Sequence, residues 1–370
     1  MENYDLDNFE PAAKIVVIGV GGAGNNAVNR MIDEEISNVE FYVANTDKQA
    51  LATSKSPNRI ILGEELTGGL GAGGEPEQGE RAARASEQVI RDIVKDANMV
   101  FIAAGMGGGT GTGAAPVIAE IAKSIEGKDI LVCAIVTRPF AFEGKKRIVN
   151  SIQGLNKLKG IVDSLIVVSN DKLLVSNSNT SISDAFSNAD AVLAQSVRTV
   201  VNLILLPAII NLDFADVKNT LKNSGVGLIG FGEANGVNAA KEAASKAITC
   251  PLIETGIQGA RRAIVAITCG PQVSLFDAQE CVNLLIESAG GEIDVKFGLN
   301  INDRLTDEIL LSVIASDFEN DIDFSMPTQV APQKPAEATE LEEKLSDAAQ
   351  REQERNFEED SIIPNFLKNK

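Results

Sequence analysis

The amino-acid sequence predicts an α/β protein with a doubly wound parallel sheet, a long central helix and a smaller α+β second domain. Three observations carry this prediction: short apolar runs rich in β-branched residues alternate with helical patterns, glycine-rich turns lie between a strand and a helix, and one helical pattern runs from 183 to 206. Strands that are apolar throughout are typical of a parallel sheet covered on both faces. At 370 residues with 44% hydrophobic side chains, the chain can form two or three domains.

The first domain is predicted at 13–182, after a flexible segment at 1–12. Its elements alternate in the βαβ order of a doubly wound sheet. The expected strands are 15–20, 41–46, 99–104, 130–137 and 165–170, and the expected helices are 25–36, 78–97, 114–125 and 145–157.

A single long helix is predicted at 183–206. Its apolar residues recur with a period of about 3.6, and Pro207 ends the pattern. A second domain is predicted at 207–318. Its expected strands are 226–231, 263–269, 294–302 and 308–316, and its expected helices are 238–249 and 275–289.

The chain changes character after Phe318. Residues 319–360 contain three prolines and then a run rich in Glu, Gln, Lys and Ala, which predicts a disordered linker. The final segment, 361–370, regains apolar groups and a net positive charge. This segment is either a frayed terminus or a short peptide that docks on a partner.

Composition excludes several classes of function. A formal net charge of −19 argues against nucleic acid as a partner. The chain has no histidine, which removes the Ser-His-Asp triad and the usual zinc sites, so we expect no activity transition near the ordinary histidine pKa of about 6.5.

Four cysteines without CxxC spacing indicate reduced thiols in the cytoplasm. The acidic N-terminus does not resemble a signal peptide, and the longest apolar stretch, 200–210, is too short to span a membrane, so we expect no direct membrane insertion.

Two glycine-rich turns predict a binding site for phosphate groups. The first, Gly19 to Gly24, matches GxGxxG between a strand and a helix, where backbone N–H groups and the helix N-terminus hold an anion. Alone, this turn fits a dinucleotide-dependent oxidoreductase equally well, with Asp47 as the acidic residue for the ribose. The second, Gly107 to Gly113, has five glycines in seven residues and also lies between a strand and a helix. Two such turns side by side would enclose a di- or triphosphate.

A third glycine-rich segment, 68–82, ends at the start of a predicted helix. It either closes over the terminal phosphate or forms an ordinary surface turn. The second turn lacks the GK[ST] sequence, which excludes a P-loop ATPase.

The heptapeptide GGGTGTG at 107–113 resembles the signature of the FtsZ family, the bacterial tubulin-like cell-division GTPases. The similarity extends over about residues 14–318 and includes GVGGAGNN (19–26), ANTD (44–47), TRPFAFEGKKR (137–147), AFSNAD (185–190) and NLDFADVK (211–218). The final IPNFLKNK is similar to the tail peptide of the family. The sequence departs from the usual family pattern at several positions, among them Glu75, Ser169 and Cys269.

The resemblance implies bound GTP or GDP, with Mg²⁺ held through the phosphates and not by dedicated protein ligands. It implies that the two glycine-rich turns hold the phosphates, that the third segment lies near the γ-phosphate, and that other side chains contact the ribose and guanine. The implied nucleotide-binding residues are Gly21, Gly22, Ala23, Gly24, Asn25, Asn26, Asn45, Ala72, Gly73, Gly107, Gly108, Gly109, Thr110, Gly111, Thr112, Gly113, Glu143, Arg147, Asn170, Phe186 and Asp190.

The guanine assignment, to Asn170, Phe186 and Asp190, agrees with side-chain chemistry. A carboxylate such as Asp190 accepts hydrogen bonds from N1–H and N2–H2 of guanine and is repelled by the lone pair of adenine, while Phe186 offers a stacking face. The alternatives are that Asp190 is a solvated helix residue, that Phe186 belongs to the core, and that Arg147 is an ordinary surface charge.

Hydrolysis requires a group that positions water, and Asp213 and Asp216 are the candidates. Their i, i+3 spacing places them on one face of a helix that begins near Asp213. The long helix carries the chain roughly 30 Å from the nucleotide, so these carboxylates cannot reach the GTP of their own subunit. They would act on the GTP of a neighbour in a head-to-tail filament, with Asn211 alongside as the resemblance implies. The alternative for Asp213 is an N-cap, and both roles can coexist.

The expected function is a GTPase activated by self-assembly, in the cytoplasm at the division site. The expected partners are further copies of the chain, and membrane-linked division proteins bound through 361–370. Two rival functions fit part of the pattern: an NAD-dependent oxidoreductase, and a nucleotide-binding scaffold that does not hydrolyse its ligand.

Overall fold

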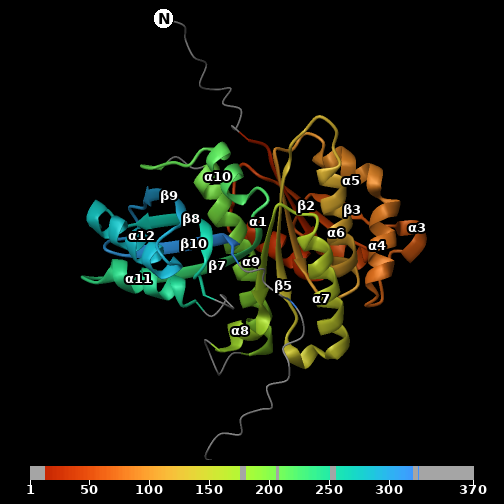
Figure 1. Cartoon of the computed structure of the whole chain (residues 1–370). Coiled ribbons are helices and arrows are strands. Elements are labelled where there is room, and N and C mark those ends of the chain that lie inside the picture. The colour runs from red at the N-terminus through yellow and green to blue at the C-terminus, as the bar shows by residue number, and fades with distance from the viewer. Residues whose placement is uncertain (1–12, 176–180, 206–207, 251–255, 320–323, 325–370) are drawn as a thin grey trace, which may run out of the picture. The chain divides into compact units, whose positions relative to one another are not determined.

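The computed structural model describes residues 13–175, 181–205, 208–250, 256–319 and 324. The chain divides into residues 1–324 and 325–370, and every described residue belongs to the first of these parts. This part is a mixed α/β structure built around one large sheet (Figure 1).

The described residues form a sheet of ten strands in the order β3-β2-β1-β4-β5-β6-β7-β10-β8-β9. Their bounds are β1 Ile15–Val20, β2 Glu40–Asn45, β3 Asn58–Ile61, β4 Met99–Gly105, β5 Leu131–Arg138, β6 Ser164–Ser169, β7 Gly225–Ala234, β8 Ala260–Cys269, β9 Asp294–Ile301 and β10 Ile309–Phe318. Strands β1 to β6 pair in parallel, which confirms the predicted parallel sheet. Their carboxyl ends therefore meet at one edge, where ligands of such sheets bind.

Helices cover both faces of the parallel strands (Figure 1). One face packs against α4 (Pro76–Ala85), α5 (Glu87–Val94), α6 (Thr110–Lys123) and α7 (Lys145–Lys159). The other packs against α1 (Gly21–Asp33), the long helix α9 (Ile182–Leu205) and α10 (Phe214–Leu221). Successive residues of a strand point to opposite faces, so β1 must be apolar at every position to serve both cores. Short helices α2 (Lys48–Ala52), α3 (Glu64–Thr67) and α8 (Asn170–Val175) lie between these elements.

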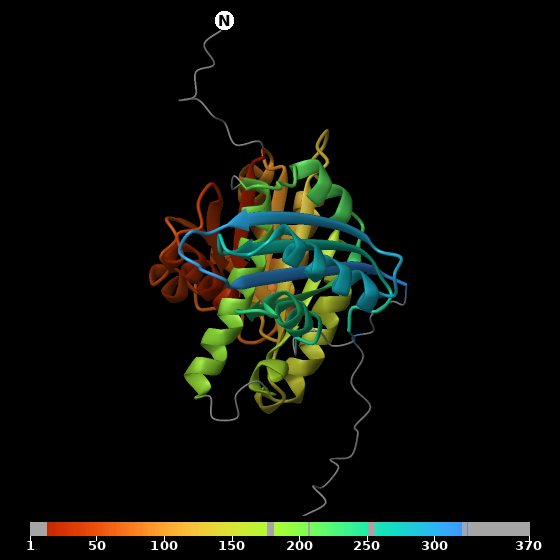
Figure 2. The same cartoon turned by 90° about the vertical axis from the view of Figure 1, so that its left-hand side faces the viewer.

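The smaller α+β part shares the same sheet. Strand β7 pairs in parallel with β6 over three residues and then runs antiparallel to β10, which also pairs antiparallel with β8. Helices α11 (Ala239–Ile248) and α12 (Leu275–Ala289) pack on these strands, as the view from this side shows (Figure 2). No helix in the described ranges combines the length and the apolar character that a membrane crossing requires.

The short helices α2, α3 and α8 were not predicted, and the other main differences concern β3, the region 78–97 and the starts of two helices. No strand is predicted at β3, which has only four residues. The helix predicted at 78–97 is two helices, because Ser86 has a non-helical ψ of 15° and its hydroxyl accepts a hydrogen bond from the N–H of Gly63. Helices α1 and α6 begin at Gly21 and Thr110, four residues before the predicted starts, so the glycine motifs form the first turns of these helices.

Candidate nucleotide-binding site

The two glycine motifs lie against each other at the carboxyl edge of the sheet. A Cβ atom on Gly21, whose φ is +72°, would come within 2.9 Å of the backbone nitrogen of Gly111. A Cβ atom on Gly24 would lie 2.2 Å from the carbonyl oxygen of Ala103 in β4. Neither position has room for a side chain, so these glycines let the two helix starts approach each other and the sheet.

The third glycine-rich segment packs onto the second motif. A Cβ atom on Gly109 would lie 2.8 Å from the Cβ atom of Ala72, and one on Gly113 would lie 1.9 Å from the carbonyl oxygen of Pro76. Gly73 and Gly74 have φ angles of +59° and +75°, which favour glycine. The segment is therefore part of the same cluster of loops and not an isolated surface turn.

Two glycines of the motifs face open space. A Cβ atom on Gly22 or on Gly108 would meet no other atom within 4 Å, and neither residue has a positive φ. Neither packing nor backbone conformation therefore requires glycine at these positions. A ligand that must approach the backbone closely does require it, and phosphate bound to the N–H groups of a helix start is such a ligand. The residues present thus fit a phosphate chain.

Threonine hydroxyls fix the second motif. The Oγ1 atoms of Thr46 and Thr110 lie 2.7 Å apart, which connects the end of β2 to the start of α6. The N–H of Gly107 donates to Oγ1 of Thr112 at 2.8 Å. These bonds hold the first turn of α6, whose N–H groups have no partners within the helix, at the edge of the sheet.

Asn25 and Asn45 stabilise the first motif. Asn25 is buried, and in the amide orientation that its neighbours require it donates to the carbonyl oxygens of Gly19 and Gly21, both at 2.9 Å. In the same orientation its oxygen accepts from Nδ2 of Asn45 at 3.2 Å. Both asparagines therefore belong to the framework of the predicted phosphate site.

Asp47 has a structural partner that the oxidoreductase alternative does not anticipate. Its carboxylate caps α2 by accepting from the backbone N–H groups of Gln49 at 2.8 Å and Ala50 at 3.3 Å. The cap accounts for Asp47 without a ribose ligand, so this residue does not by itself favour the oxidoreductase alternative.

A hollow of about 540 Å³ opens beside the first motif, between α1 and α9. Its lining residues are Asn26, Asn29, Arg30, Asp33, Phe186, Ser187 and Asp190. Phe186 is 41% exposed and lies edge-on to Phe140, with ring centroids 5.1 Å apart. Phe186 is therefore not a core residue, and its ring remains accessible to a planar ligand.

Asp190 is not a solvated helix residue. Burial raises its pKa to about 7, although the nearby charge of Arg30 and a hydrogen bond with Asn26 act in the opposite direction. The expectation of no activity transition near pH 6.5 rested on the absence of histidine and stays a prediction, and the raised pKa of Asp190 places another titratable group in this range. That expectation took carboxyl pKa values as ordinary, and the packing of α9 against α1 changes the pKa of Asp190.

Asn170 is the third residue predicted to contact guanine, and it does not line the hollow between α1 and α9. It is 5% exposed at the start of α8, and its Oδ1 atom has no hydrogen-bond partner among the described residues. A buried polar atom without a partner is unfavourable unless a ligand or water supplies one. Nearby, Glu143 accepts from the N–H of Phe140 at 2.9 Å and forms an ion pair with Arg147, whose exposed side chain also fits the alternative of a surface charge.

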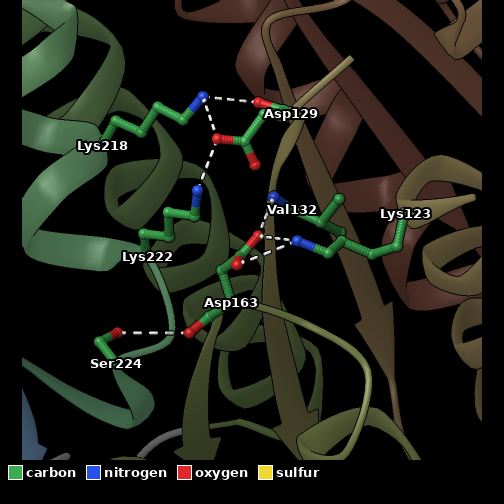
Figure 3. Close-up of polar contacts among 7 residues, drawn as sticks. All are labelled: Lys123, Asp129, Val132, Asp163, Lys218, Lys222 and Ser224. Carbon is green, nitrogen blue, oxygen red and sulfur yellow. Dashed lines mark hydrogen bonds and ion pairs between the residues drawn. The ribbon is translucent and has the colours of Figure 1, made fainter. Parts of the chain in front are cut away.

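The predicted hydrolytic residues lie at the other end of the sheet. Asp213 is the N-cap of α10 and accepts from the N–H of Asp216 at 2.7 Å, so the predicted cap is present. Lys218 of α10 donates to the carbonyl oxygen of Asp129, just before β5 begins (Figure 3). The glycine motifs lie beyond the opposite end of the sheet, and an eight-residue strand spans about 25 Å. The structure thus does not bring Asn211, Asp213 and Asp216 to the nucleotide residues of the same chain.

A polar network holds α10 and β7 to the parallel strands (Figure 3). The buried carboxylate of Asp163 accepts from Nζ of Lys123 at 2.9 Å and from the N–H of Val132 at 2.9 Å. The carbonyl oxygen of Asp163 accepts from the N–H of Ser224, which leads into β7, at 2.8 Å. Ser224 lies three residues after the end of α10, so this network connects the segment between α10 and β7 to β5 and β6.

No group of three or more His, Cys, Asp or Glu side chains in the described part of the chain could hold a metal ion. The candidate nucleotide site instead offers backbone N–H groups, side-chain amides and charged side chains such as Arg30, Arg147 and Asp190.

Several residues that line the hollow between α1 and α9 were not predicted from the sequence. Asn29, Arg30 and Asp33 follow Asn26 at helical spacing on α1, so they share its face, and this periodicity was the available signal. Ser187 lies next to the predicted Phe186, and its hydroxyl and carbonyl both accept from Nη1 of Arg30, at 3.2 and 3.4 Å.

The fold and the site together define a nucleotide-binding protein built on a doubly wound parallel sheet. Residues 14–178 match the GTPase domain of the Tubulin/FtsZ family, and residues 225–319 match the C-terminal domain of the FtsZ family. An FtsZ dimer from M. jannaschii is 37% identical, with a TM-score of 0.77 over 87% of this chain and 95% of that one. A mutant FtsZ from M. jannaschii is 39% identical, with a TM-score of 0.79 over 84% of this chain and 94% of that one. This chain belongs to the Tubulin/FtsZ family.

The fold extends to more distant proteins. A GDP-bound monomer of CetZ1 from Haloferax volcanii is 22% identical, with a TM-score of 0.73 over 84% of this chain and 96% of that one. At this identity the similarity concerns the fold alone.

Proposed function

We propose that the chain binds GTP and hydrolyses it to GDP and phosphate in a head-to-tail polymer, where one subunit holds the nucleotide and the next supplies Asp213 and Asp216. One observation carries this proposal: the glycine motifs and the two carboxylates lie at opposite ends of one sheet, in a chain whose family carries a GTPase domain. A contact that joins opposite ends of identical subunits is heterologous and extends into a filament. The FtsZ dimer among the similar structures supports self-assembly.

In this proposal the two helix starts bind the phosphates. The N–H groups at the first turns of α1 and α6 donate to phosphate oxygens, and Gly22 and Gly108 allow the backbone to approach them. Asp190 accepts from N1–H and N2–H2 of guanine, Phe186 stacks on the base, and Asn170 supplies a further polar contact. Mg²⁺ bound through the phosphates would neutralise part of the charge that develops during hydrolysis.

The carboxylates of the neighbouring subunit position the attacking water. Asp213 is exposed and uses one oxygen to cap α10. A carboxylate offers about four acceptor positions, so capping leaves others free for water. Asp216 and the exposed Asn211 lie within three residues of Asp213 in the sequence.

The family resemblance further supports a role in bacterial cell division, in the cytoplasm at the division site. It also supports 361–370 as a peptide that binds membrane-linked division proteins; this segment lies outside the described residues. Deleting Ser361 to Lys370 should leave assembly intact and abolish capture of such proteins in a pull-down. Unchanged capture would support the alternative that 361–370 is a frayed terminus.

The proposed function is tested by measuring GTP turnover against protein concentration, with electron microscopy and light scattering of the same samples. We expect turnover per subunit to rise cooperatively as filaments appear. Turnover that is independent of concentration, or nicotinamide binding in place of GTP binding, would contradict the proposal. Filaments that bind GTP and release no phosphate would indicate a non-hydrolysing scaffold.

A further inference from the structure

Helix α7 reaches two of the glycine-rich loops through one buried side chain. Asn150 is 8% exposed, and its Nδ2 atom donates to the carbonyl oxygens of Gly74 and Gly107, each at 3.3 Å. The two hydrogens of a single amide therefore serve two loops that are far apart in the sequence. Asn150 belongs to neither glycine motif and is not among the nucleotide-binding residues predicted from the sequence.

Besides the bond to Asn150, the loop at 72–75 has a turn hydrogen bond from the N–H of Glu75 to the carbonyl oxygen of Ala72 at 3.0 Å and packs on Gly109. Gly73 and Gly74 both adopt positive φ angles, and a Cβ atom on either would meet nothing within 4 Å. At its far end the loop is held to α7 by the exposed ion pair of Glu75 with Lys146, at 2.5 Å. Because exposed ion pairs stabilise little, the buried amide is the stronger of the two connections.

Glycines raise the conformational entropy of a free loop, so an anchor decides how much of that entropy a ligand must remove on binding. Asn150 restrains Gly74 directly, and it also restrains Gly107, the first residue of the second motif. The contact of Ala72 with Gly109 then continues the connection to the middle of that motif.

We propose that Asn150 is a positioning residue that holds the loop at 72–75 on the second glycine motif and thereby sets the preference of the site for a nucleoside triphosphate over a diphosphate. The proposal rests on the proposed function, in which Ala72 and Gly73 lie near the γ-phosphate. GDP lacks that phosphate and makes no use of the loop at 72–75, and Gly107 keeps its hydrogen bond to Thr112 without Asn150, so releasing the loop weakens GTP binding more than GDP binding.

The test compares Asn150→Ala and Asn150→Leu with wild type, and uses Asn156→Ala, an exposed position on the same helix, as the matched control. Dissociation constants for GTP and GDP are measured at protein concentrations too low for assembly. We expect GTP affinity to fall by roughly two- to tenfold, as for loss of a hydrogen bond, and GDP affinity to change by less than about twofold. The control should match wild type for both nucleotides.

Hydrogen exchange of the nucleotide-free chain provides a second measurement. Peptides that cover 72–75 and 107–109 should exchange faster in both Asn150 variants than in wild type, while peptides from β1 remain unchanged. Equal losses of GTP and GDP affinity, no loss of either, or unchanged exchange in both loops would overturn the proposal. A wild-type chain that binds neither nucleotide would overturn the proposed function, and the exchange comparison would still decide whether Asn150 holds the loops.

Discussion

Lys218 donates to the backbone carbonyl oxygen of Asp129 at 2.6 Å, which connects α10 to the start of β5. The carboxylate of Asp129 also pairs with Lys218 at 3.0 Å and with Lys222 at 2.5 Å. Because α10 carries Asp213 and Asp216, these contacts help to define where the two carboxylates lie relative to the nucleotide at the far end of the same strand.

Removing the carboxylate of Asp129 should affect GTP hydrolysis more than GTP binding. We expect Asp129→Asn to retain GTP affinity and assembly but to lower GTP turnover within filaments by about two- to fivefold, because small misplacements of catalytic groups reduce rates. Asp96→Asn, which removes a different exposed partner of a lysine, is the control and should turn over GTP normally. Normal turnover in Asp129→Asn would show that the carboxylate of Asp129 does not position α10.

The same residue predicts a pH effect on stability. Hydrogen bonds from Lys222 and Lys218 lower the pKa of Asp129 to about 2. A carboxyl group with a lowered folded-state pKa stabilises the fold above its unfolded pKa of about 3.9, and this contribution is lost as pH falls toward 2. Denaturant unfolding should therefore find Asp129→Asn less stable than wild type at pH 6, with the difference shrinking from pH 4 to pH 2. A difference that stays constant with pH would refute this.

Removing the hydrolytic carboxylates should leave nucleotide binding intact. We expect Asp216→Ala to lower turnover by about a hundredfold or more, the range for loss of acid–base catalysis. Asp213→Asn preserves a good N-cap while removing the charge, so it separates capping from catalysis. Mixing Asp216→Ala subunits with subunits that cannot bind GTP should restore part of the turnover, since mixed contacts recreate complete sites. Full activity of either variant alone would refute the assignment.

Asp190 should make guanine binding pH-dependent in a chain without histidine. With a pKa of about 7, the carboxyl group is mostly protonated at pH 6 and mostly ionised at pH 8. Only the ionised form accepts both guanine donors, so affinity for GDP should rise by roughly tenfold over this range, with a proton released on binding at neutral pH. Phosphate groups also titrate near pH 6, so the comparison is with Asp190→Asn, which should bind more weakly and lack the additional dependence. Identical pH profiles would show that Asp190 does not contact the base.

Two glycines of one motif should respond to alanine in opposite ways. Gly22→Ala should fold at least as stably as wild type, because the position is helical and open, yet bind nucleotide much more weakly. Gly24→Ala places a Cβ atom 2.2 Å from the carbonyl oxygen of Ala103, so it should lower the thermal unfolding temperature markedly. Both are checked by thermal unfolding without nucleotide and by titration with GDP. Wild-type affinity in Gly22→Ala would exclude this motif as a phosphate site.

Local sequence patterns predicted much of this protein. Apolar runs gave the positions of the parallel strands, the period of α9 predicted its length to within a residue at each end, and Asp213 was recognised as a cap. Glycine-rich turns after β1 and β4 predicted a phosphate site because both must lie at one edge of a parallel sheet. The strands, the long helix and the cap depend on residues close together in the sequence. The phosphate site follows from the rule that the carboxyl ends of parallel strands lie at one edge of the sheet.

The sequence alone determined the class of fold, the location of the two glycine motifs and the separation of Asp213 and Asp216 from them. Only the tertiary structure decided which glycines serve packing and which face open space, that burial raises the pKa of Asp190, that Arg30 and Ser187 line the hollow between α1 and α9, and that Asn150 joins two loops. The physical reason is that exclusion of a Cβ atom, desolvation of a carboxyl group and a shared amide donor all depend on atoms from distant parts of the chain. No local periodicity encodes those distances.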